Sequence, residues 1–314
     1  TWGPTEEQGI AMAPDGLSFV TAMALQNQST WLHDGEGERQ ISTLEGIAAN
    51  PKFTADGKKL CYTIVREAPT PFSPQPGELW VADVESGRSQ VLTPGMPVFD
   101  YDVSPDGGTV VLQAADAEGR DRLWLIPLDR RSPARPIPGV EGNQPKFGAN
   151  GEIFFRKSER NSNFIYRMAV DGSGLRQVID DPVPLLHAVS PDGNWIVGWT
   201  RLPDDGMALQ AFSSSGGDIV RIADFMGLMW SPRGSSLVVT GGPVPANRSY
   251  IIPLSAGEQL PPIPEEGFLS EHDIANVPGA RRVDALTVPG PTPEIYAFYR
   301  GTTQRNLYRV PVQP

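Results

Sequence analysis

The sequence is poor in residues that ligate metals or form disulfides. It contains one cysteine, Cys61, and three histidines in 314 residues. One cysteine excludes both an internal disulfide and a cysteine-based zinc site. The histidines His33, His187 and His272 lie far apart and follow no H-x-x-x-H spacing. We therefore predict no metal and no cofactor.

Positive charge and long apolar runs are also scarce. Lys and Arg number 26 against 37 Asp and Glu, which leaves a net charge of −11 and argues against a nucleic-acid-binding surface. No apolar run approaches the ~20 residues of a membrane-spanning helix, so we predict no membrane insertion. The chain begins at Thr1 without a signal-like segment, and we interpret it as a domain taken from a longer protein.

Turn-forming residues, by contrast, are abundant. The chain has 33 glycines and 32 prolines, and the glycines follow no every-third-residue rule that would indicate collagen. Hydrophobic residues make up 39% of the chain, with seven tryptophans, which is enough to bury a core and argues against disorder. The composition indicates a folded protein with many turns.

The turns recur at a regular interval along the chain. The tetrapeptide Ser-Pro-Asp-Gly or a variant of it occurs six times, with its glycine at Gly16, Gly57, Gly107, Gly151, Gly193 and Gly234. Proline fixes φ, aspartate caps backbone amides and glycine accepts a positive φ, so each copy predicts a tight reversal. The aspartates are accordingly interpreted as turn caps and not as metal ligands.

Short strand-like runs flank each reversal and indicate a β-propeller. A third run follows about 25 residues later and a fourth after another turn, which is the pattern of a four-stranded antiparallel blade. Seven third-strand markers predict an all-β, seven-bladed propeller in one domain: Trp31, Trp80, Trp124, Tyr166, Leu209, Ile251 and Tyr308. The predicted blades span residues 8–42, 47–93, 98–139, 142–180, 185–224, 227–264 and 284–312. Residues 1–3, with Thr1 and Trp2, are expected to close the last blade as its fourth strand beside residues 307–312.

The repeat resembles the PD40, or TolB-type, WD40-like propeller repeat. The resemblance lies in the Ser-Pro-Asp-Gly tetrapeptides, the aromatic third strand and a fourth strand ending in Leu92-Thr93. The stretches 277–282 and 304–311 also resemble extracytoplasmic propellers of bacterial receptor-like Ser/Thr kinases and winged-helix regulators. This second resemblance implies a sensor segment whose effector lies upstream.

Catalytic motifs are missing from the sequence. There is no G-x-S-x-G nucleophile elbow, no phosphate-binding glycine loop and no room for the hydrolase domain that follows TolB-type propellers in prolyl-oligopeptidase-like peptidases. We therefore predict that the propeller itself is not an enzyme. Cys61 falls inside a second strand and is predicted to be a buried, inert thiol.

Two regions are predicted to bind a ligand or partner. The first is the mouth of the central channel, lined by residues at or just before the start of a first strand: Glu6, Glu7, Asn50, Asp100, Gln144, His187 and Met226. The second is a rim formed by two long segments, 66–77 and 258–283, which we expect on one face of the propeller. Its candidate contact residues are Phe72, Glu265, Glu266, Phe268 and His272.

The sequence thus favours a monomeric module that binds a protein, peptide or small molecule on one face. The first interpretation is the extracytoplasmic sensor domain of a bacterial signalling protein. A free periplasmic scaffold of the TolB kind, and a lyase- or lactonase-type propeller enzyme that uses channel residues, remain as alternatives.

Overall fold

The computed structural model describes residues 5–42, 46–65, 75–203, 205–224, 226–241 and 248–312. Strands dominate this part of the chain, which also holds a five-residue α-helix, α1 (Glu271–Ala275), and a 3₁₀ turn, η1 (Ala149–Gly151). Four sheets are separate four-stranded antiparallel units, and a fifth sheet has nine strands. The prediction of an all-β chain built from four-stranded antiparallel units is confirmed.

The nine-stranded sheet contains two such units and an additional strand. Blade 1 has the order β24-β25-β2-β3, and blade 2 the order β4-β5-β6-β7. They are joined through one parallel bridge, between Gln28 and Ile47, and β1 pairs with β2 outside both units. The strands concerned are β1 (Thr5–Met12), β2 (Ser18–His33), β3 (Glu38–Gln40), β4 (Ile47–Phe53), β5 (Lys59–Val65), β6 (Glu78–Asp83), β7 (Ser89–Val91), β24 (Thr287–Pro289) and β25 (Tyr296–Pro311).

The remaining four blades follow one another along the chain. Blade 3 comprises β8 (Asp100–Val103), β9 (Thr109–Ala115), β10 (Asp121–Pro127) and β11 (Arg135–Glu141). Blade 4 comprises β12 (Asn143–Phe147), β13 (Ile153–Glu159), β14 (Ser162–Met168) and β15 (Arg176–Gln177). Blade 5 comprises β16 (Leu185–Val189), β17 (Trp195–Arg201), β18 (Met207–Ser213) and β19 (Ile219–Ala223). Blade 6 comprises β20 (Met226–Trp230), β21 (Ser236–Gly241), β22 (Ser249–Pro253) and β23 (Arg281–Val283).

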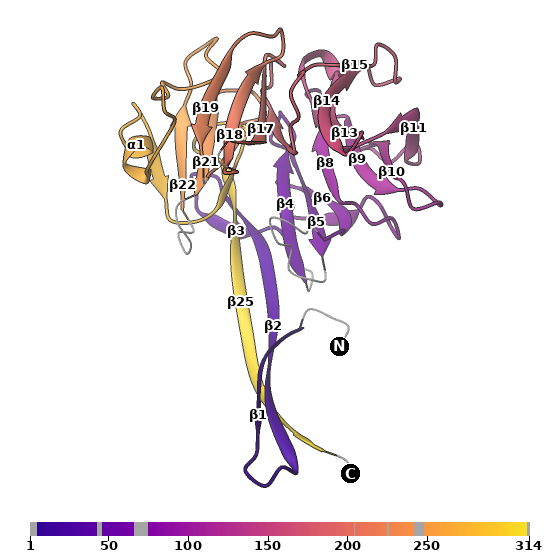
Figure 1. Ribbon diagram of the computed structural model, residues 1–314, viewed down its shortest axis with the longest axis vertical. Helices are drawn as coiled ribbons and strands as arrows, with labels where there is room; N and C mark the ends of the chain where they lie inside the picture. The colour runs from indigo at the N-terminus through magenta and orange to yellow at the C-terminus, as the bar shows by residue number, and fades with distance from the viewer. Residues whose placement is uncertain are drawn as a thin grey trace.

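The first strands of the blades form the inside of a closed ring. Each of β4, β8, β12, β16 and β20 contacts the next one along the chain, β20 contacts β24, and β24 returns to β4. Neighbouring blades bury apolar side chains between them, as between blades 2 and 3, where Cys61, Leu79, Tyr101 and Leu112 pack together. The described residues therefore form a six-bladed β-propeller (Figure 1).

The prediction of seven blades is wrong because it counted one blade twice. The third-strand marker Trp31 and the predicted first two strands of the last blade belong to the same unit, since β2 and β25 pair over 16 consecutive residues. No glycine or proline interrupts β2, so the run after the first reversal and the run around Trp31 form one continuous strand and not two. The fourth strand of blade 1 is β3; Thr1 and Trp2, to which closure had been assigned, lie outside the described residues.

A narrow arm leaves the ring at blade 1. It consists of β1 and the outer parts of β2 and β25, residues 5–27 and 301–312 (Figure 1). Its base lies beside Ile47, where β4 begins. We call this side of the ring the arm face and the opposite side, which holds the Asp-Gly reversals of the blades, the turn face.

The reversals have the geometry that their sequence predicts. Asp106 accepts a hydrogen bond from the Gly108 amide at 2.9 Å, and Gly107 has a φ of +69°. Ser104 adds a bond from its hydroxyl to Asp106 and accepts one from the Thr109 amide. Asp56, Asp106 and Asp192 therefore cap turns at separate blades around the ring, as predicted, and Asp15 caps the turn of the arm in the same way.

The segment between β22 and β23 packs against the outside of blades 5 and 6. Phe268 forms an isolated parallel bridge to Ala223, and its amide donates to the Ile222 carbonyl at 2.7 Å. Phe268 is 1% exposed and Ile274 of α1 is fully buried, both in the core shared by these blades. This segment connects the third and fourth strands of blade 6 and is part of the core, whereas the predicted blade bounds placed residues 265–283 between two blades.

Candidate functional site

Two lysines are presented at the ring centre by the same local sequence. Blade 2 carries Asn50-Pro51-Lys52-Phe53 and blade 4 carries Gln144-Pro145-Lys146-Phe147. Asn50 and Gln144 both have a positive φ, 50° and 52°, and the strand register shifts at both places. Such bulges redirect side chains at the end of a strand. The equivalent lysines thereby flank β8 of blade 3, which lies between them.

The lysines pair with two aspartates of β8. Lys52 Nζ lies 2.8 Å from Asp102 Oδ1, and Lys146 Nζ lies 2.5 Å from Asp100 Oδ2. Asp102 also accepts the Phe147 amide at 2.7 Å. The four charges sum to zero and come from three consecutive blades. We call these four residues the central cluster.

The central cluster is partly accessible to solvent. The side chains of Lys52, Asp100 and Asp102 are between a fifth and three-tenths exposed, while that of Lys146 is 9% exposed. Burial raises the pKa of Asp100, but the nearby ammonium groups of Lys146 and Lys52 outweigh it, and the pKa is lowered overall. Burial lowers the pKa of Lys146, whereas Asp102 and Asp100 outweigh burial at Lys52 and raise its pKa. The two lysines thus differ in basicity, and Lys146 releases its proton more readily.

Polar side chains beside the cluster connect successive blades. Gln113 accepts the Gln144 amide at 3.1 Å, and the Gln144 side chain accepts the Leu186 amide at 2.8 Å. His187 Nε2 accepts the Leu228 amide at 3.0 Å. Burial, with the nearby Lys146 charge, lowers the pKa of His187 to about 4, so the imidazole group of His187 is neutral at pH 7. These groups hold blades 3, 4, 5 and 6 in register around the cluster.

The structure separates the residues predicted at the channel mouth. Asp100 belongs to the central cluster, Gln144 and His187 lie beside it, and Asn50 contributes its backbone carbonyl, which accepts the Tyr101 hydroxyl at 2.5 Å. Glu6 and Glu7 lie on β1 in the arm, so their placement at the mouth is wrong. Met226 begins β20, and its side chain lies outside the described part.

Sequence reasoning missed Lys52, Asp102 and Lys146. A signal for them was available, because the tetrapeptide Asn/Gln-Pro-Lys-Phe occurs at the same place in two repeats. The pattern Asp100-Tyr101-Asp102 also places two carboxylates on one side of a first strand, with tyrosine on the other.

The predicted partner-binding rim does not form a single apolar surface. Glu265, Glu266 and His272 are exposed, but Phe268 is buried in the core and is unavailable to a partner. Phe72 lies outside the described residues. Replacing residues 259–273 by a short link would remove Phe268 from the core and should therefore destabilise the ring.

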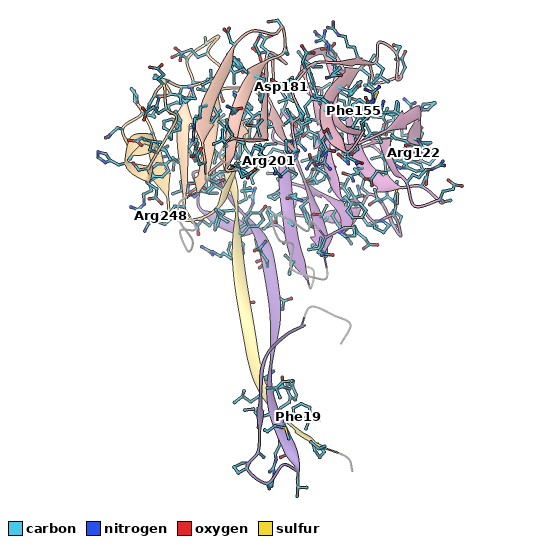
Figure 2. The ribbon with its side chains drawn as sticks, in the orientation of Figure 1. Phe19, Arg122, Phe155, Asp181, Arg201 and Arg248 are labelled. Carbon is cyan, nitrogen blue, oxygen red and sulfur yellow. The ribbon has the colours of Figure 1, made fainter. Side chains whose placement is uncertain are left out.

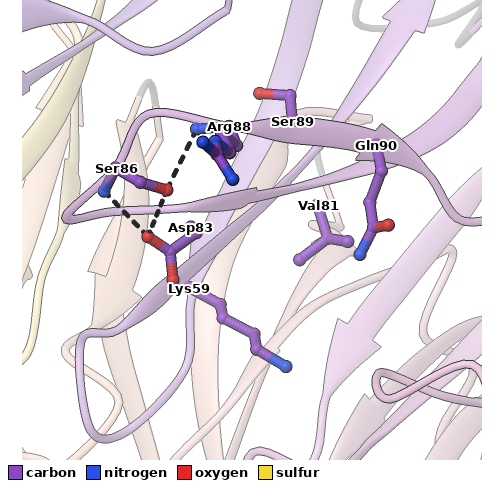
Figure 3. Close-up of a pocket in the computed structure, with 7 residues that line it drawn as sticks. All are labelled: Lys59, Val81, Asp83, Ser86, Arg88, Ser89 and Gln90. Carbon is purple, nitrogen blue, oxygen red and sulfur yellow. Dashed lines mark hydrogen bonds between the residues drawn. The ribbon is translucent and has the colours of Figure 1, made fainter.

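A separate surface pocket lies on the turn face of blade 2 (Figure 3). It has a volume of about 510 Å³ and is lined by Lys59, Val81, Asp83, Ser86, Arg88, Ser89 and Gln90. Asp83 accepts two hydrogen bonds from Ser86, and the Ser86 hydroxyl accepts the Arg88 amide. These groups are already engaged in a turn, so the central cluster is the stronger candidate site.

Among the residues that the structure describes, no three His, Cys, Asp or Glu side chains gather as a metal site would require. The described helix is too short and too polar to cross a membrane.

Curated relatives of the chain include enzymes. Dipeptidyl-peptidase 5 of Trichophyton equinum is 23% identical over 224 residues, which cover 63% of this chain and 30% of that protein. The chain thus spans about a third of the length of the curated relatives it matches. No family model matches the chain.

Solved structures with the same fold include TolB proteins and a lyase. TolB from Acinetobacter baumannii has a TM-score of 0.54 at 17% identity, covering 79% of this chain and 60% of that one. A protein from Agrobacterium tumefaciens assigned as TolB has a TM-score of 0.59 at 14% identity, with 88% and 99% covered. Oligogalacturonate lyase in complex with manganese has a TM-score of 0.50 at 14% identity, with 81% and 83% covered.

These likenesses correct one prediction and confirm another. The prediction that the propeller is not an enzyme is contradicted, because its relatives include a dipeptidyl-peptidase and an oligogalacturonate lyase. The resemblance to kinase-linked propellers has no counterpart among these relatives. The resemblance to TolB-type propellers is confirmed at the level of the fold, and the chain is a β-propeller with a fold similar to that of the TolB structures.

Proposed function

We propose that this propeller binds a polypeptide segment over the central cluster, as the recognition part of an extracytoplasmic protein. The observation that carries the proposal is the cluster itself, in which two lysines and two aspartates from three blades lie partly exposed at the ring centre. Burying four charges costs free energy that apolar residues at these positions would not cost. A function in recognition gives a reason for their presence.

The pairing suits a ligand that carries charges of both signs. A ligand carboxylate can replace Asp102 beside Lys52, while a ligand ammonium group replaces Lys146 beside Asp100. Such an exchange displaces Asp102 and Lys146, whose charges are opposite in sign and can pair with each other, whereas a purely anionic ligand would leave two aspartates facing negative charge. A peptide end with an adjacent charged side chain has the required chemistry. The name of the curated relatives, dipeptidyl-peptidase, supports a peptide ligand.

The location and biological context belong to the same proposal. The resemblance to TolB-type propellers favours a place outside the cytoplasm, and a sensor domain of a bacterial signalling protein would use its ligand site in this way. A free scaffold would use the same face to hold a protein partner.

A peptide-binding experiment tests the proposal. The probe is a pool of random heptapeptides with free ends, compared with the same pool acetylated and amidated at its ends. We expect the immobilised propeller to retain the free-ended pool preferentially. Asp100→Asn combined with Lys146→Met removes an ion pair without leaving a lone charge and should reduce retention at least ~10-fold.

Matched variants separate recognition from folding. Glu118→Gln alters an exposed ion pair with Arg120 outside the cluster and should retain peptides as the wild type does. Lys52→Gln changes a more exposed member of the cluster. If the double variant fails to fold, this single variant still tests the site. Equal retention of both pools, or retention that survives both cluster variants, would overturn the proposal.

A second candidate function is acid–base catalysis at the same cluster. The observation in its favour is Lys146, an amine whose pKa is lowered by burial and which lies 2.5 Å from Asp100. A lysine of this kind can accept a proton from a substrate carbon next to a carbonyl or carboxylate. Incubation with oligogalacturonate, followed by the absorbance of an unsaturated product, tests this function. Turnover that is abolished in Lys146→Met supports it, and the absence of turnover in the wild type rejects it.

A further inference from the structure

The pocket on the turn face of blade 2 has a wall that carries cations at its outer end. Val81 and Gln90 lie opposite each other on β6 and β7, and Lys59 and Asp83 lie opposite each other two residues nearer the turn. The Arg88 carbonyl accepts the Asp83 amide at 2.9 Å, which places Arg88 in the same row. Residues two apart in a strand share a face. All five side chains therefore lie on the face that blade 2 turns toward blade 3, where Val81 joins the shared core.

The turn uses the Asp83 carboxylate but leaves the two cations of this row free. Asp83 Oδ1 accepts the Ser86 amide at 2.8 Å and the Ser86 hydroxyl at 2.7 Å. These hydrogen bonds lower the pKa of Asp83, with a smaller contribution from the Lys59 charge, so the carboxylate is ionised. Within the part of the chain that the structure describes, neither the Lys59 ammonium group nor the Arg88 guanidinium group forms an ion pair or a hydrogen bond.

Arginines elsewhere on the ring have carboxylate partners. Figure 2 shows Arg122 and Arg248 on opposite sides of the ring. Arg122 Nε lies 2.9 Å from Asp116 Oδ2, and Arg248 Nη1 lies 3.1 Å from Glu271 Oε2. The chain has 37 Asp and Glu against 26 Lys and Arg, so carboxylates are plentiful. Two free cations in one pocket therefore leave positive charge available to a ligand.

Blade 3 adds a third cation and orients an amide at the edge of the pocket. Arg130 Nη1 donates to Gln90 Oε1 at 3.0 Å, which leaves the Nε2 group of Gln90 to donate to a ligand. Val81, which is 3% exposed, gives the pocket an apolar patch. Figure 3 shows the side chains of Val81 and Gln90 side by side, with Lys59 on the same side of the hairpin. The volume of about 510 Å³ lies within the range of about 300–1,000 Å³ that is usual for small-molecule sites.

We infer that this pocket binds a small organic molecule with two anionic groups. Lys59, Arg88 and Arg130 against Asp83 leave two positive charges, which a dianion neutralises. The planar Arg88 guanidinium group matches a carboxylate or a phosphate in geometry, and Lys59 supplies a point charge for the second anionic group. Gln90 can donate to a neutral polar group between them. The site lies between blades 2 and 3, away from the central cluster, and does not depend on the function proposed there.

Calorimetric titration at low salt tests the site with three probes, which are glucose 6-phosphate, succinate and glucose. The wild type should bind at least one of the two dianions with a dissociation constant below about 1 mM and should not bind glucose. Binding of glucose 6-phosphate alone would assign the site to phosphate esters, and binding of succinate alone to dicarboxylates. Lys59→Gln combined with Arg88→Gln removes both free cations and should raise the dissociation constant at least ~10-fold.

Matched variants separate a built site from the general charge of the turn face. Lys58→Gln combined with Arg131→Gln removes the same charge from exposed positions that do not line the pocket, and should change the dissociation constant by less than about 2-fold. Asp83→Asn keeps an acceptor for Ser86 and removes the carboxylate of the pocket, so it should tighten binding by about 3-fold or more. This gain does not depend on the stability of the first double variant.

Four results would each overturn the inference. They are the absence of saturable binding of either dianion, binding of glucose as tight as that of the dianions, equal losses in the two double variants, and weaker binding by folded Asp83→Asn protein.

Discussion

Blade 5 and the arm contain nearly the same turn tetrapeptide, but the strands on either side of it pack differently in the two regions. In Ala13-Pro14-Asp15-Gly16 the Asp15 carboxylate accepts the Leu17 amide at 2.9 Å, and in Ser190-Pro191-Asp192-Gly193 Asp192 accepts the Asn194 amide at 3.0 Å. The glycines have φ values of +69° and +74°. The turn of the arm and the turn of the ring are thus nearly identical.

The strands on either side of these turns have opposite environments. Ile196 and Leu186 of blade 5 are almost completely buried, whereas Ile10, Met12 and Leu17 of the arm are more than half exposed. A Pro-Asp-Gly turn therefore specifies a hairpin but not its packing. Packing requires a neighbouring blade on each side, and the arm has none because β2 and β25 extend past the ring.

Thiol reactivity should show the largest difference between the two regions. Burial raises the pKa of Cys61 from 9.0 to about 12, which lowers its thiolate fraction near pH 8 by a factor on the order of 1000. The prediction of a buried free thiol is confirmed by the structure. Labelling with a bulky disulfide reagent should be slow in the native protein and fast after unfolding. Leu17→Cys, in the arm turn, should label at once; equal native rates for the two thiols would contradict the contrast.

Truncating a buried aromatic residue of the ring should reduce the free energy of unfolding much more than truncating an exposed residue of the arm. Phe268→Ala should lower the free energy of unfolding by about 3–5 kcal/mol, because it opens a cavity between blades 5 and 6. Leu307→Ala, at an arm residue that is 77% exposed, should change it by less than about 0.5 kcal/mol. Urea unfolding followed by tryptophan fluorescence measures both. A small loss for Phe268→Ala would mean that the segment 254–280 does not belong to the core.

Acidification should destabilise the ring through His187. Its pKa is about 4 in the folded chain and 6.5 ordinarily, so the unfolded chain binds a proton more readily between these values. The free energy of unfolding should therefore have its full value above pH 6.5 and decrease by about 3 kcal/mol as the pH decreases to 4. Thermal unfolding across this range measures the loss.

Matched histidine variants isolate this effect. His187→Gln keeps an acceptor for the Leu228 amide and should flatten the dependence of the free energy of unfolding on pH between 6.5 and 4. His272→Gln, at an exposed position, serves as the matched control. A wild-type profile that is already flat in this window would show that His187 is protonated in the folded chain.

The smallest expected effect concerns the first residue of the turn. The Ser190 hydroxyl donates to Asp192 at 2.6 Å and accepts the Trp195 amide at 2.9 Å. Ser190→Ala leaves that amide without a partner and should cost about 1–2 kcal/mol. Ala13→Ser introduces the same hydroxyl in the exposed arm turn, where it should contribute less than about 0.5 kcal/mol. Melting temperatures of the two variants measure the difference. If the decrease for Ser190→Ala and the increase for Ala13→Ser were equally large, burial would not determine how much the hydroxyl contributes to stability.

Several features of the site could be predicted from sequence, and others could not. Asp100, Gln144 and His187 were found because first strands line the ring centre in any propeller. Lys52 and Lys146 were not, because lysine is usually a surface residue and only the bulges at Asn50 and Gln144 direct these two toward Asp102 and Asp100. Phe268 was misplaced because an aromatic residue in an irregular segment gives no periodic signal of burial.

The sequence by itself determined the elements and their local turns. The repeated Pro-Asp-Gly reversals and the alternating runs around them specify four-stranded antiparallel units, since these signals act within a few residues. The tertiary structure decided how many units close the ring and which strands complete blade 1. That choice depends on pairing between β2 and β25, whose partners are more than 260 residues apart in the chain, and on the packing of β24 against β4. Contacts over such separations leave no local pattern in the residues, so only the folded chain reveals six blades and an arm.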